Sequence, residues 1–478
     1  MRSRAWHYYA LAFATVVMIS CSHTGETPTS IPTLAPTSAL TFSLAPSKIF
    51  FNGRVITMEQ DIPLAEAIAV LDNEILAVGT NAQVLAISGP DTQVIDLDGK
   101  ALLPGFVDAH NHLFSEAYNS GSPTLREAQE FALQHGITAL ADMSVDHSVL
   151  KEIQDFQGLG KLRIRTSLYL AYNLHCGEIL GNWYLEYPPD MDPTHMLRIP
   201  GVKIFTDGWT CRLLPAFSFE LQDARDAAHA RGDLLLTEED LTNILVELQS
   251  AGYQVAIHAV GDRAVENALD ALESALEGAP NTLRHRMEHN MYIRPELLPK
   301  YGQLGVTPVV WNSKACFIQD TASIDAQGRV THNRGGPKTH SWVNPWHSLL
   351  GANPGLPVAF HSDMSWGEPG PTANLYSLIT RNEVRANDNP VCEAPDWLAR
   401  EAITAEDALR LMTIEAAHVL FMEEKIGSLK PGKFADLIIL SDSPLTVAPH
   451  SLLDLDVLLT MVGGHIEHCV AKYQALCP

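Results

Sequence analysis

Short apolar runs alternate with amphipathic segments along most of the chain, and this alternation is typical of parallel strands connected by helices. A helical spacing of apolar residues is clearest in Glu238–Ser250 and Ala264–Leu276. The apolar runs that we predict as strands are Leu102–Ala109, Ile137–Met143, Arg163–Leu170, Val202–Thr206, Gln254–His258, Arg284–His289, Val306–Trp311 and Val358–Ser362. Eight such strands, separated by segments long enough for helices, predict an α/β fold of the (β/α)₈ TIM-barrel type.

A second pattern, with apolar residues alternating along the chain, marks both ends of the globular region. Residues 49–58 and 67–78 alternate in this way around Asn52-Gly53 and Asp72-Asn73, which are turn sequences typical of β-hairpins. Further short strands are expected within residues 434–465, between glycines and prolines. We therefore predict a small β-sandwich domain formed from both ends of the mature chain.

The N-terminus carries the pattern of an export signal. Arg2 and Arg4 precede the apolar run Tyr8–Ile19, which is too short to span a bilayer. Met18-Ile19-Ser20-Cys21 resembles the lipobox of bacterial lipoproteins, in which the cysteine is lipidated and becomes the new N-terminus. An ordinary signal peptide cut elsewhere is the alternative.

These patterns divide the chain into five parts. They are a lipoprotein-type signal peptide (1–21), a tether rich in Thr, Ser and Pro (22–46), the two parts of the β domain (47–101 and 426–478) and the barrel (102–425). The expected product is an exported protein of the bacterial cell envelope. Its lipid anchor would hold it on the periplasmic or cell-surface face of a membrane.

Charge and cysteine usage narrow the classes of partner. The formal net charge of −24 argues against binding to nucleic acid or to an anionic lipid surface. The seven cysteines show no Cys-x-x-Cys spacing, so a structural zinc site is not expected. Cys469 and Cys477 are close enough in sequence to pair, although spacing does not establish connectivity.

Residues that commonly bind metals occur where the predicted strands end. In Asp108-Ala-His-Asn-His112, a strand would direct the two histidines to the same side. Each residue alone has an ordinary explanation, such as a surface histidine, an edge lysine, a hydrogen-bonded core histidine or a helix-capping aspartate. Together, at the active end of a barrel, they predict a metal site. The candidates are His110, His112, Lys203, His258, His289 and Asp363.

Several motifs resemble those of a known family. They are Leu103–His112, Val202–Gly208, His258–Arg263, Arg286–His289, Pro345–Leu349, His361–Asp363 and Ile426–Asp436. On these motifs the chain resembles the amidohydrolase superfamily, in the branch that contains N-substituted formamide deformylases. The resemblance covers nearly everything after the tether. It implies a metal-dependent hydrolase that cleaves a non-peptide C–N bond, such as that of an amide or an N-formyl or N-acyl amine.

The resemblance also implies roles for the six candidates. His110, His112 and Asp363 would bind the more buried metal, His258 and His289 would bind a second metal, and Lys203 would bridge both as a carboxylated lysine. A free ammonium cannot bind a metal, so an unmodified lysine would leave a single metal on His110, His112, His258 and Asp363. One or two divalent cations are expected. Zinc is the first expectation, and iron or manganese also suits these ligands.

The implied reaction uses hydroxide activated by the metal, with Asp363 as general base and then general acid. A mononuclear deaminase or a cyclic amidase of the same superfamily stays open as an alternative, and so does a non-catalytic, lipid-anchored binding protein. Mononuclear deaminases of the superfamily carry a glutamate three residues after the histidine of strand 5. This chain has Gly261 there, which argues against a nucleobase deaminase.

Residues that contact the small-molecule substrate are expected on the loops after the strands. The candidates are Trp209, Arg212, Arg263, Trp311 and Trp366. Arg263 could instead pair with Asp262 or Glu288. Alternation along the strand predicts that Glu288 points away from His289 and is structural, whereas Asp108 shares a face with His110 and is expected to support it.

Overall fold

The computed structural model describes residues 45–208, 211, 213–221, 227–312, 315, 336–363, 370–384, 391–473 and 475–477. The predicted signal peptide, Cys21 and nearly all of the predicted tether lie outside these residues. Among the described residues, no helix has both the length and the apolar content needed to cross a membrane.

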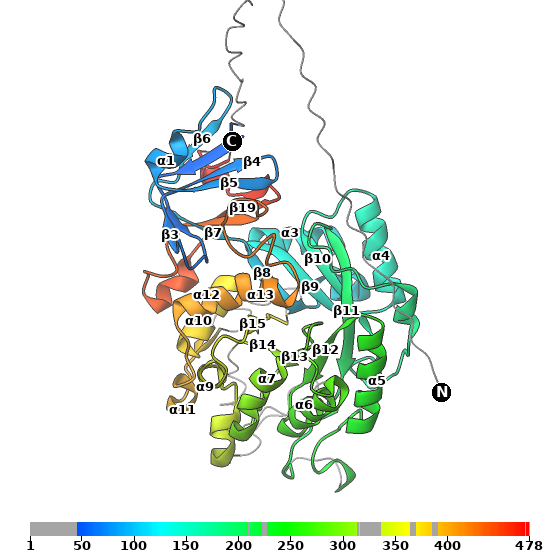
Figure 1. Ribbon diagram of the computed structural model, residues 1–478. Coiled ribbons are helices and arrows are strands. Elements are labelled where there is room, and N and C mark those ends of the chain that lie inside the picture. The colour runs from blue at the N-terminus through cyan, green and yellow to red at the C-terminus, as the bar shows by residue number, and fades with distance from the viewer. Residues whose placement is uncertain are drawn as a thin grey trace, which may run out of the picture. The chain divides into compact units, whose positions relative to one another are not determined.

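Eight parallel strands form the central sheet, and each pairs with the next along the chain (Figure 1). They are β8 (Phe106–Asn111), β9 (Ile137–Val145), β10 (Arg165–Ala171), β11 (Leu197–Phe205), β12 (Gln254–Ala259), β13 (Arg286–His289), β14 (Thr307–Val310) and β15 (Ala359–Phe360). The last strand returns to the first, because the Asp363 amide donates to the His110 carbonyl over 3.1 Å. The predicted (β/α)₈ barrel is confirmed.

The predicted strand Leu102–Ala109 is wrong in one respect, because it is two strands in different sheets. β7 (Ala101–Pro104) pairs with β2 and β18 in the β domain, and β8 starts the barrel after Gly105. A Cβ atom at Gly105 would lie 2.2 Å from the Thr138 side chain, so the crossing point needs glycine. Pro104-Gly105 is a turn signal, but the local sequence does not show that the two strands join different sheets, because both are buried.

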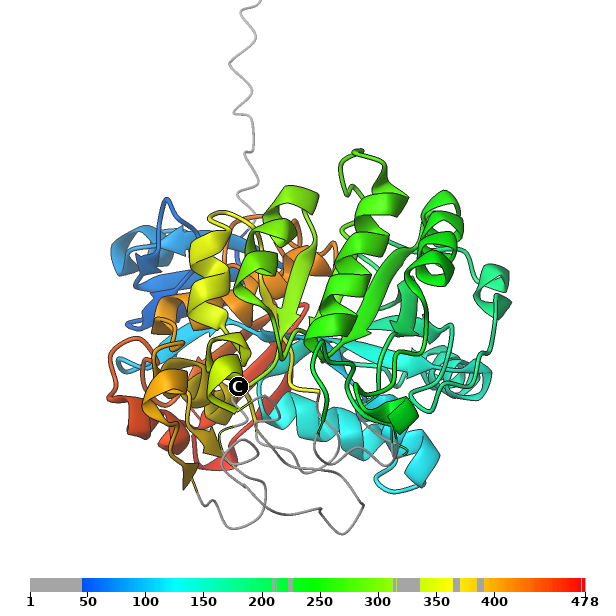
Figure 2. The same ribbon diagram turned by 90° about the horizontal axis from the view of Figure 1, so that it is seen from below.

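Helices follow most of the strands, and several begin at residues that cap them. Thr124 and Thr237 accept backbone hydrogen bonds at the starts of α3 and α5. Figures 1 and 2 show α5 and α6 side by side outside the barrel strands. The helices are α1 (Asn81–Leu85), α2 (Leu113–Ser120), α3 (Leu125–Gln134), α4 (His147–Gly158), α5 (Glu238–Ser250), α6 (Asp262–Leu276), α7 (Leu298–Leu304), α9 (Trp346–Ala352), α10 (Pro371–Thr380), α11 (Asp396–Ala399), α12 (Ala405–Leu411) and α13 (Ile414–Val419).

Helix α13 covers the end of the barrel at which the strands begin. Its residues Ala416 and Ala417 share an apolar cluster with Val107 and Ala109 of β8. The side chain of Gln254, the first residue of β12, donates to the carbonyl of Val419 over 2.9 Å. The opposite end, where the strands finish, is therefore the end available for chemistry.

The β domain consists of two sheets whose facing side chains form one apolar cluster. One sheet has the order β5-β4-β1-β6, and the other has the order β20-β19-β18-β7-β2-β3. Their remaining strands are β1 (Lys48–Phe51), β2 (Arg54–Ile56), β3 (Leu64–Ala65), β4 (Ala67–Leu71), β5 (Glu74–Gly79), β6 (Gln93–Asp96), β18 (Leu437–Leu440), β19 (Val457–Val462) and β20 (His465–Cys469). A separate two-stranded ladder joins β16 (Glu383–Val384) to β17 (Val391–Cys392). The predicted β-sandwich built from both ends of the mature chain is confirmed.

Only one of the two predicted hairpins forms. β4 and β5 pair around Asp72-Asn73, as predicted. The hairpin at Asn52-Gly53 is wrong, because β1 and β2 lie in different sheets. Asn52 does turn the chain, with a φ of 58°, but Phe50 and Val55 then enter the shared core from opposite sheets. The sequence predicts the local turn, but packing of the shared core determines which strands β1 and β2 pair with.

Disulfides and surface charge add to the predictions made from composition. The structure pairs Cys469 with Cys477, and Cys176 with Cys211.

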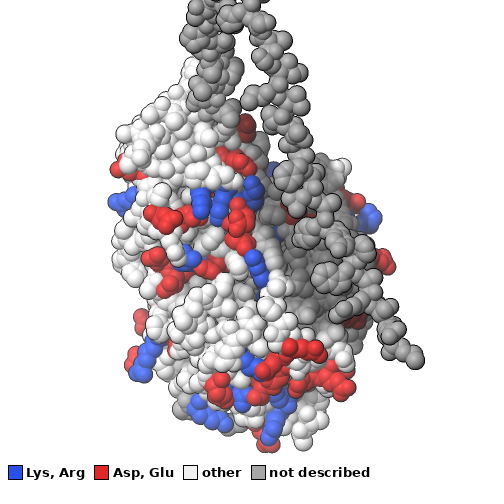
Figure 3. Space-filling model, viewed as in Figure 1, with Lys and Arg blue, Asp and Glu red and all other residues white. Residues whose placement is uncertain are grey.

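On the face shown in Figure 3, the Lys and Arg side chains of the described residues lie among Asp and Glu side chains. They form no separate basic surface on that face.

A buried ion pair joins the barrel to the β domain. Arg165 of β10 and Asp436, next to β18, are in contact through Nε–Oδ2 at 2.6 Å and Nη2–Oδ1 at 3.0 Å. Both side chains are almost fully buried.

We predict that Asp436→Ala lowers the free energy of unfolding by about 3–5 kcal/mol, because it leaves a buried guanidinium without its partner. Denaturant unfolding measures this loss. The control is Asp442→Ala, which removes the exposed Arg54–Asp442 pair and should cost less than about 1 kcal/mol. Equal losses in the two variants would contradict the prediction.

Candidate metal centre

Three donor atoms converge at the end of β8. The Nε2 atoms of His110 and His112 are 3.3 Å apart, and Asp363 Oδ1 lies 3.0 Å from the first and 3.4 Å from the second. A zinc ion with bonds of 2.0–2.1 Å has tetrahedral ligands about 3.3 Å apart. The donor set and its spacing therefore fit one divalent cation.

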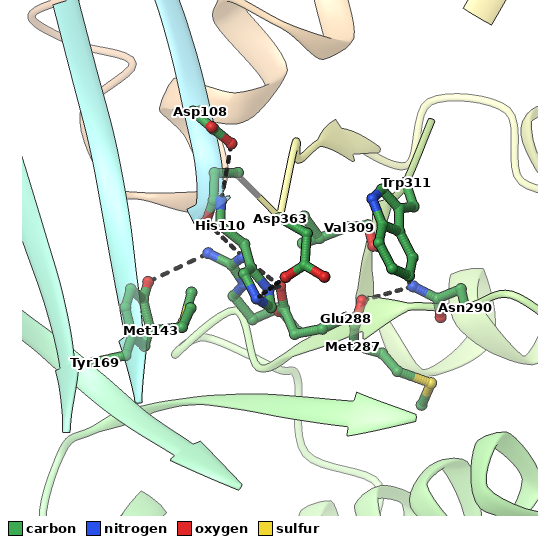
Figure 4. Close-up of polar contacts among 12 residues, drawn as sticks. Asp108, His110, Met143, Tyr169, Met287, Glu288, Asn290, Val309, Trp311 and Asp363 are labelled. Carbon is green, nitrogen blue, oxygen red and sulfur yellow. Dashed lines mark hydrogen bonds and ion pairs between the residues drawn. The ribbon is translucent and has the colours of Figure 1, made fainter. Parts of the chain in front are cut away.

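A carboxylate behind His110 fixes the orientation of its ring. His110 Nδ1 lies 2.7 Å from Glu288 Oε2 (Figure 4). Arg286 contacts the same carboxylate through Nε and Nη2 at 2.6 and 2.7 Å. Burial would raise the pKa of Glu288, but the Arg286 guanidinium and the His110 hydrogen bond hold it well below its usual range. The ionised carboxylate accepts the Nδ1 proton, so Nε2 keeps its lone pair for a metal.

The expectation that Glu288 points away from His289 was wrong, and Glu288 contacts the predicted ligand His110 as well as Arg286. The expectation was based on alternation along β13, which would place Glu288 and His289 on opposite faces. His289 has a φ of 67°, so the alternation ends there. As a result Glu288 contacts His110, while the His289 ring lies 4.9 Å from the His110 ring.

His112 and Asp363 are held by the backbone. His112 Nδ1 donates to the carbonyl of Met143 on β9 over 3.1 Å, which leaves Nε2 free to bind a metal. Asp363 follows β15 with a φ of 56°, and its amide donates to the carbonyl of His110. Burial would raise the pKa of Asp363, but the neighbouring histidines hold it well below its usual range.

The other predicted ligands lie around the same point. Lys203 on β11 is fully buried, and among the described residues its ammonium has no hydrogen-bond partner. Burial lowers the pKa of Lys203 to about 8. The ring of His258 on β12 lies 4.5 Å from the ring of His289, and its Nε2 is 3.3 Å from Asp207 Oδ1. His289 closes the group at the end of β13.

One residue in the centre was missed from the sequence. A nitrogen of His361 lies within 4.8 Å of donor atoms of both His289 and Asp363. His361 and Asp363 have the same i, i+2 spacing as His110 and His112, so the strand rule applied to the first pair could have found the second.

The predicted substrate contacts have mixed outcomes. Trp311 donates through Nε1 to the carbonyl of Ser362 over 3.1 Å, and its ring packs 5.3 Å from that of His289. Arg263 contacts the carbonyl of Gly232 at 3.4 Å. Neither carboxylate suggested for Arg263 is bound to it, because Asp262 contacts Arg294 and Glu288 contacts Arg286. Trp209, Arg212 and Trp366 lie outside the described residues.

Asp108 supports the site as expected, through the backbone. Its carboxylate accepts hydrogen bonds from the amide and the hydroxyl of Ser362, and its Oδ1 lies 3.4 Å from the His110 amide. Burial raises the pKa of Asp108 to about 6, and these hydrogen bonds act in the opposite direction. Asp108 thus links the two strands that carry His110 and Asp363.

Comparison with known proteins identifies the family. A profile described as "Amidohydrolase family" matches residues 93–142 and 122–468. The chain belongs to the amidohydrolase family. It is a metal-dependent hydrolase that acts on carbon–nitrogen bonds other than peptide bonds, and the predicted family membership is confirmed.

Curated relatives of this amidohydrolase align over most of their lengths. Protein LONG AFTER FAR-RED 3 of Arabidopsis thaliana is 23% identical over 86% of this chain and 90% of its own length. N-substituted formamide deformylase of Arthrobacter pascens is 22% identical over 88% of this chain and 98% of its own length. Imidazolonepropionase of Symbiobacterium thermophilum is 24% identical over 78% of this chain and 83% of its own length.

Solved structures share the fold of the amidohydrolase. An uncharacterized metal-dependent hydrolase from Pyrococcus furiosus has a TM-score of 0.65 and 20% identity, and the match covers 84% of this chain and 100% of that one. A Xaa-Pro dipeptidase has a TM-score of 0.61 and 18% identity, with 88% of this chain and 99% of that one covered.

We predict that Glu288→Gln lowers the affinity for the first metal by about 10–100-fold, because the neutral amide no longer holds the Nδ1 proton of His110 as a carboxylate does. Zinc titration of the metal-free protein measures this change. The control is Glu296→Gln, at an exposed side chain, which should leave the affinity unaltered. Unchanged affinity in Glu288→Gln would show that the carboxylate does not orient the ligand.

Lys203 gives a pH-dependent prediction. Its folded pKa of about 8 lies below the ordinary value of 10.5, so the buried ammonium destabilises the unmodified, metal-free protein by about 3 kcal/mol at pH 7. This penalty is fully present below pH 8 and is lost as the pH rises towards the unfolded pKa. We expect metal-free Lys203→Met to be more stable than the wild type at pH 7, with a difference that shrinks between pH 8 and 10. Denaturant unfolding across this range measures it, and a constant difference would contradict the assignment.

Proposed function

We propose that this amidohydrolase hydrolyses the C–N bond of an N-formyl or N-acyl amine, or of a related small amide, with water activated at a divalent metal centre. The observation that carries the proposal is the triangle of His110 Nε2, His112 Nε2 and Asp363 Oδ1, whose edges match those of a tetrahedral metal site. The similarity to an N-substituted formamide deformylase supports the substrate class.

The proposed ligand set is His110, His112 and Asp363 for one cation, with His258 and His289 for a second and a carboxylated Lys203 between them. Zinc is the proposed metal. When bound, a divalent cation lowers the pKa of water and polarises a carbonyl oxygen. The low pKa of Lys203 supports its modification, because only the neutral amine reacts with carbon dioxide.

Asp363 is the proposed proton carrier. Its Oδ1 belongs to the donor triangle, and its side chain is 18% exposed, so the carboxylate can also reach a reacting molecule. We assign it to accept a proton from water and to deliver that proton to the departing nitrogen. Its depressed pKa keeps the carboxylate ionised.

The deaminase alternative is weakened by the backbone at Gly261. A Cβ atom there would lie 2.0 Å from the carbonyl oxygen of Ala216, so no side chain fits at the position where the related deaminases carry a glutamate. The chain therefore lacks the proton donor that ring deamination would need at this point.

We expect the zinc-loaded protein to release amines from N-formyl and N-acyl amines, to lose this activity on chelation and to regain it when zinc is added back. The assay should compare these substrates with cyclic amides, Xaa-Pro dipeptides and nucleobases. His195→Ala, at an exposed histidine paired with Asp190, is the control that should retain activity. A fully metal-loaded protein that turns over none of these classes would favour the binding-protein alternative.

We also propose that the enzyme is exported and anchored to the cell envelope through a lipid on Cys21. The disulfides Cys176–Cys211 and Cys469–Cys477 support an oxidising compartment. Detergent-phase partitioning tests this proposal. The wild-type protein should enter the detergent phase and Cys21→Ser should not, whereas equal partitioning into water would contradict the anchor.

A further inference from the structure

His361 follows β15, and one of its ring nitrogens lies within 4.8 Å of donor atoms of His289 and Asp363. The residue is fully buried. Its ring stacks on that of His110, with centroids 4.6 Å apart and planes at 19°, and on that of Trp311, with centroids 5.7 Å apart and planes at 24°. The ring is thus held in place by aromatic contacts.

Packing gives the ring nitrogens of His361 no hydrogen-bond partner among the described residues. His289 Nδ1 is in the same situation. Buried polar atoms are normally hydrogen-bonded, and leaving them unpaired is costly. A phenylalanine could provide the same stacking without that cost. The imidazole is therefore explained best by a ligand for its nitrogen.

The surrounding donors indicate the ligand. One donor atom from each of His289, His361 and Asp363 lies within 4.8 Å of the other two, and two neutral imidazoles with a carboxylate suit a divalent transition metal. His258 Nε2 lies 3.3 Å from Asp207 Oδ1, and neither nitrogen of His258 has a hydrogen-bond partner among the described residues either. A second cation beside His289 would find in His361 a nitrogen that no other group occupies.

We propose that His361 is a further ligand of the second divalent cation, beside His289. This inference rests on the proposed function, which requires a metal centre. It adds to that centre a donor that follows β15, beside His258 of β12 and His289 of β13. It also explains why a histidine occupies a buried position that offers no hydrogen bond.

The test is a zinc titration of metal-free wild-type and His361→Phe proteins, followed by calorimetry and by metal analysis after dialysis. Phenylalanine keeps a planar ring for stacking and removes both nitrogens. We expect two zinc ions per wild-type chain. In His361→Phe we expect one, or a second bound at least 100-fold more weakly. The melting temperature of the metal-free variant should equal or exceed that of the wild type, while the increase produced by zinc should be smaller.

The matched control is His285→Phe, the same substitution at a buried histidine that precedes β13 at its opposite end. This variant loses the hydrogen bond from the Val255 amide, so it should be less stable yet bind zinc as the wild type does. Two sites of unchanged affinity in His361→Phe would overturn the inference and leave the proposed function standing. A wild-type protein that binds no zinc would overturn both.

If His361→Phe does not fold, anomalous diffraction from zinc-loaded wild-type crystals decides the question. The inference expects a zinc ion about 2.0–2.1 Å from a nitrogen of His361. A zinc ion bound to His289 with both His361 nitrogens beyond about 3 Å would overturn it.

Discussion

Closure of the barrel between its first and last strands is the constraint on which the metal centre depends. His110 and Asp363 are far apart in the sequence, yet the Asp363 amide donates to the His110 carbonyl, and the Asp108 carboxylate binds the amide and hydroxyl of Ser362. These bonds join β8 to the end of β15, and in doing so they place Asp363 Oδ1 against the two histidines of β8. Folding and assembly of the site are therefore the same event.

The buried carboxylate of Glu288 then orients the ligand His110. Glu288 is fully buried between Arg286 and His110, and its ionised state depends on both. A buried pair of this kind contributes little net stability, because desolvation offsets the attraction. The pair instead determines which ring nitrogen of His110 carries the proton. Metal binding at the carboxyl ends of the strands thus depends on the buried Arg286–Glu288 salt bridge.

The barrel and most of the ligands were predictable because they leave local signals. Buried parallel strands appear as apolar runs, and ligands follow the ends of those runs, so His110, His112, His258, His289 and Asp363 could all be placed. The resemblance of several motifs to those of amidohydrolases also indicated the family. Each of these inferences needs only neighbouring residues and the topology of one repeated unit.

The errors come from features that neighbouring residues do not encode. The left-handed conformation of His289 ends the strand alternation, so Glu288 was assigned to the wrong face. Gly105 moves an apolar run from one sheet to another, and the turn at Asn52 joins two sheets because core packing chose the strand partners. His361 was not singled out, although its i, i+2 spacing from Asp363 repeats that of His110 and His112, and the structure shows its nitrogens without hydrogen-bond partners among the described residues.

The most direct test of the account is the metal content of each chain in protein that lacks residues 1–46, determined by elemental analysis after expression with zinc. The donor triangle at His110, His112 and Asp363 and the second cluster beside it predict about two zinc ions per chain. A zinc-free chain obtained under these conditions would contradict the central claim, because the convergence of these side chains would then serve some purpose other than metal binding.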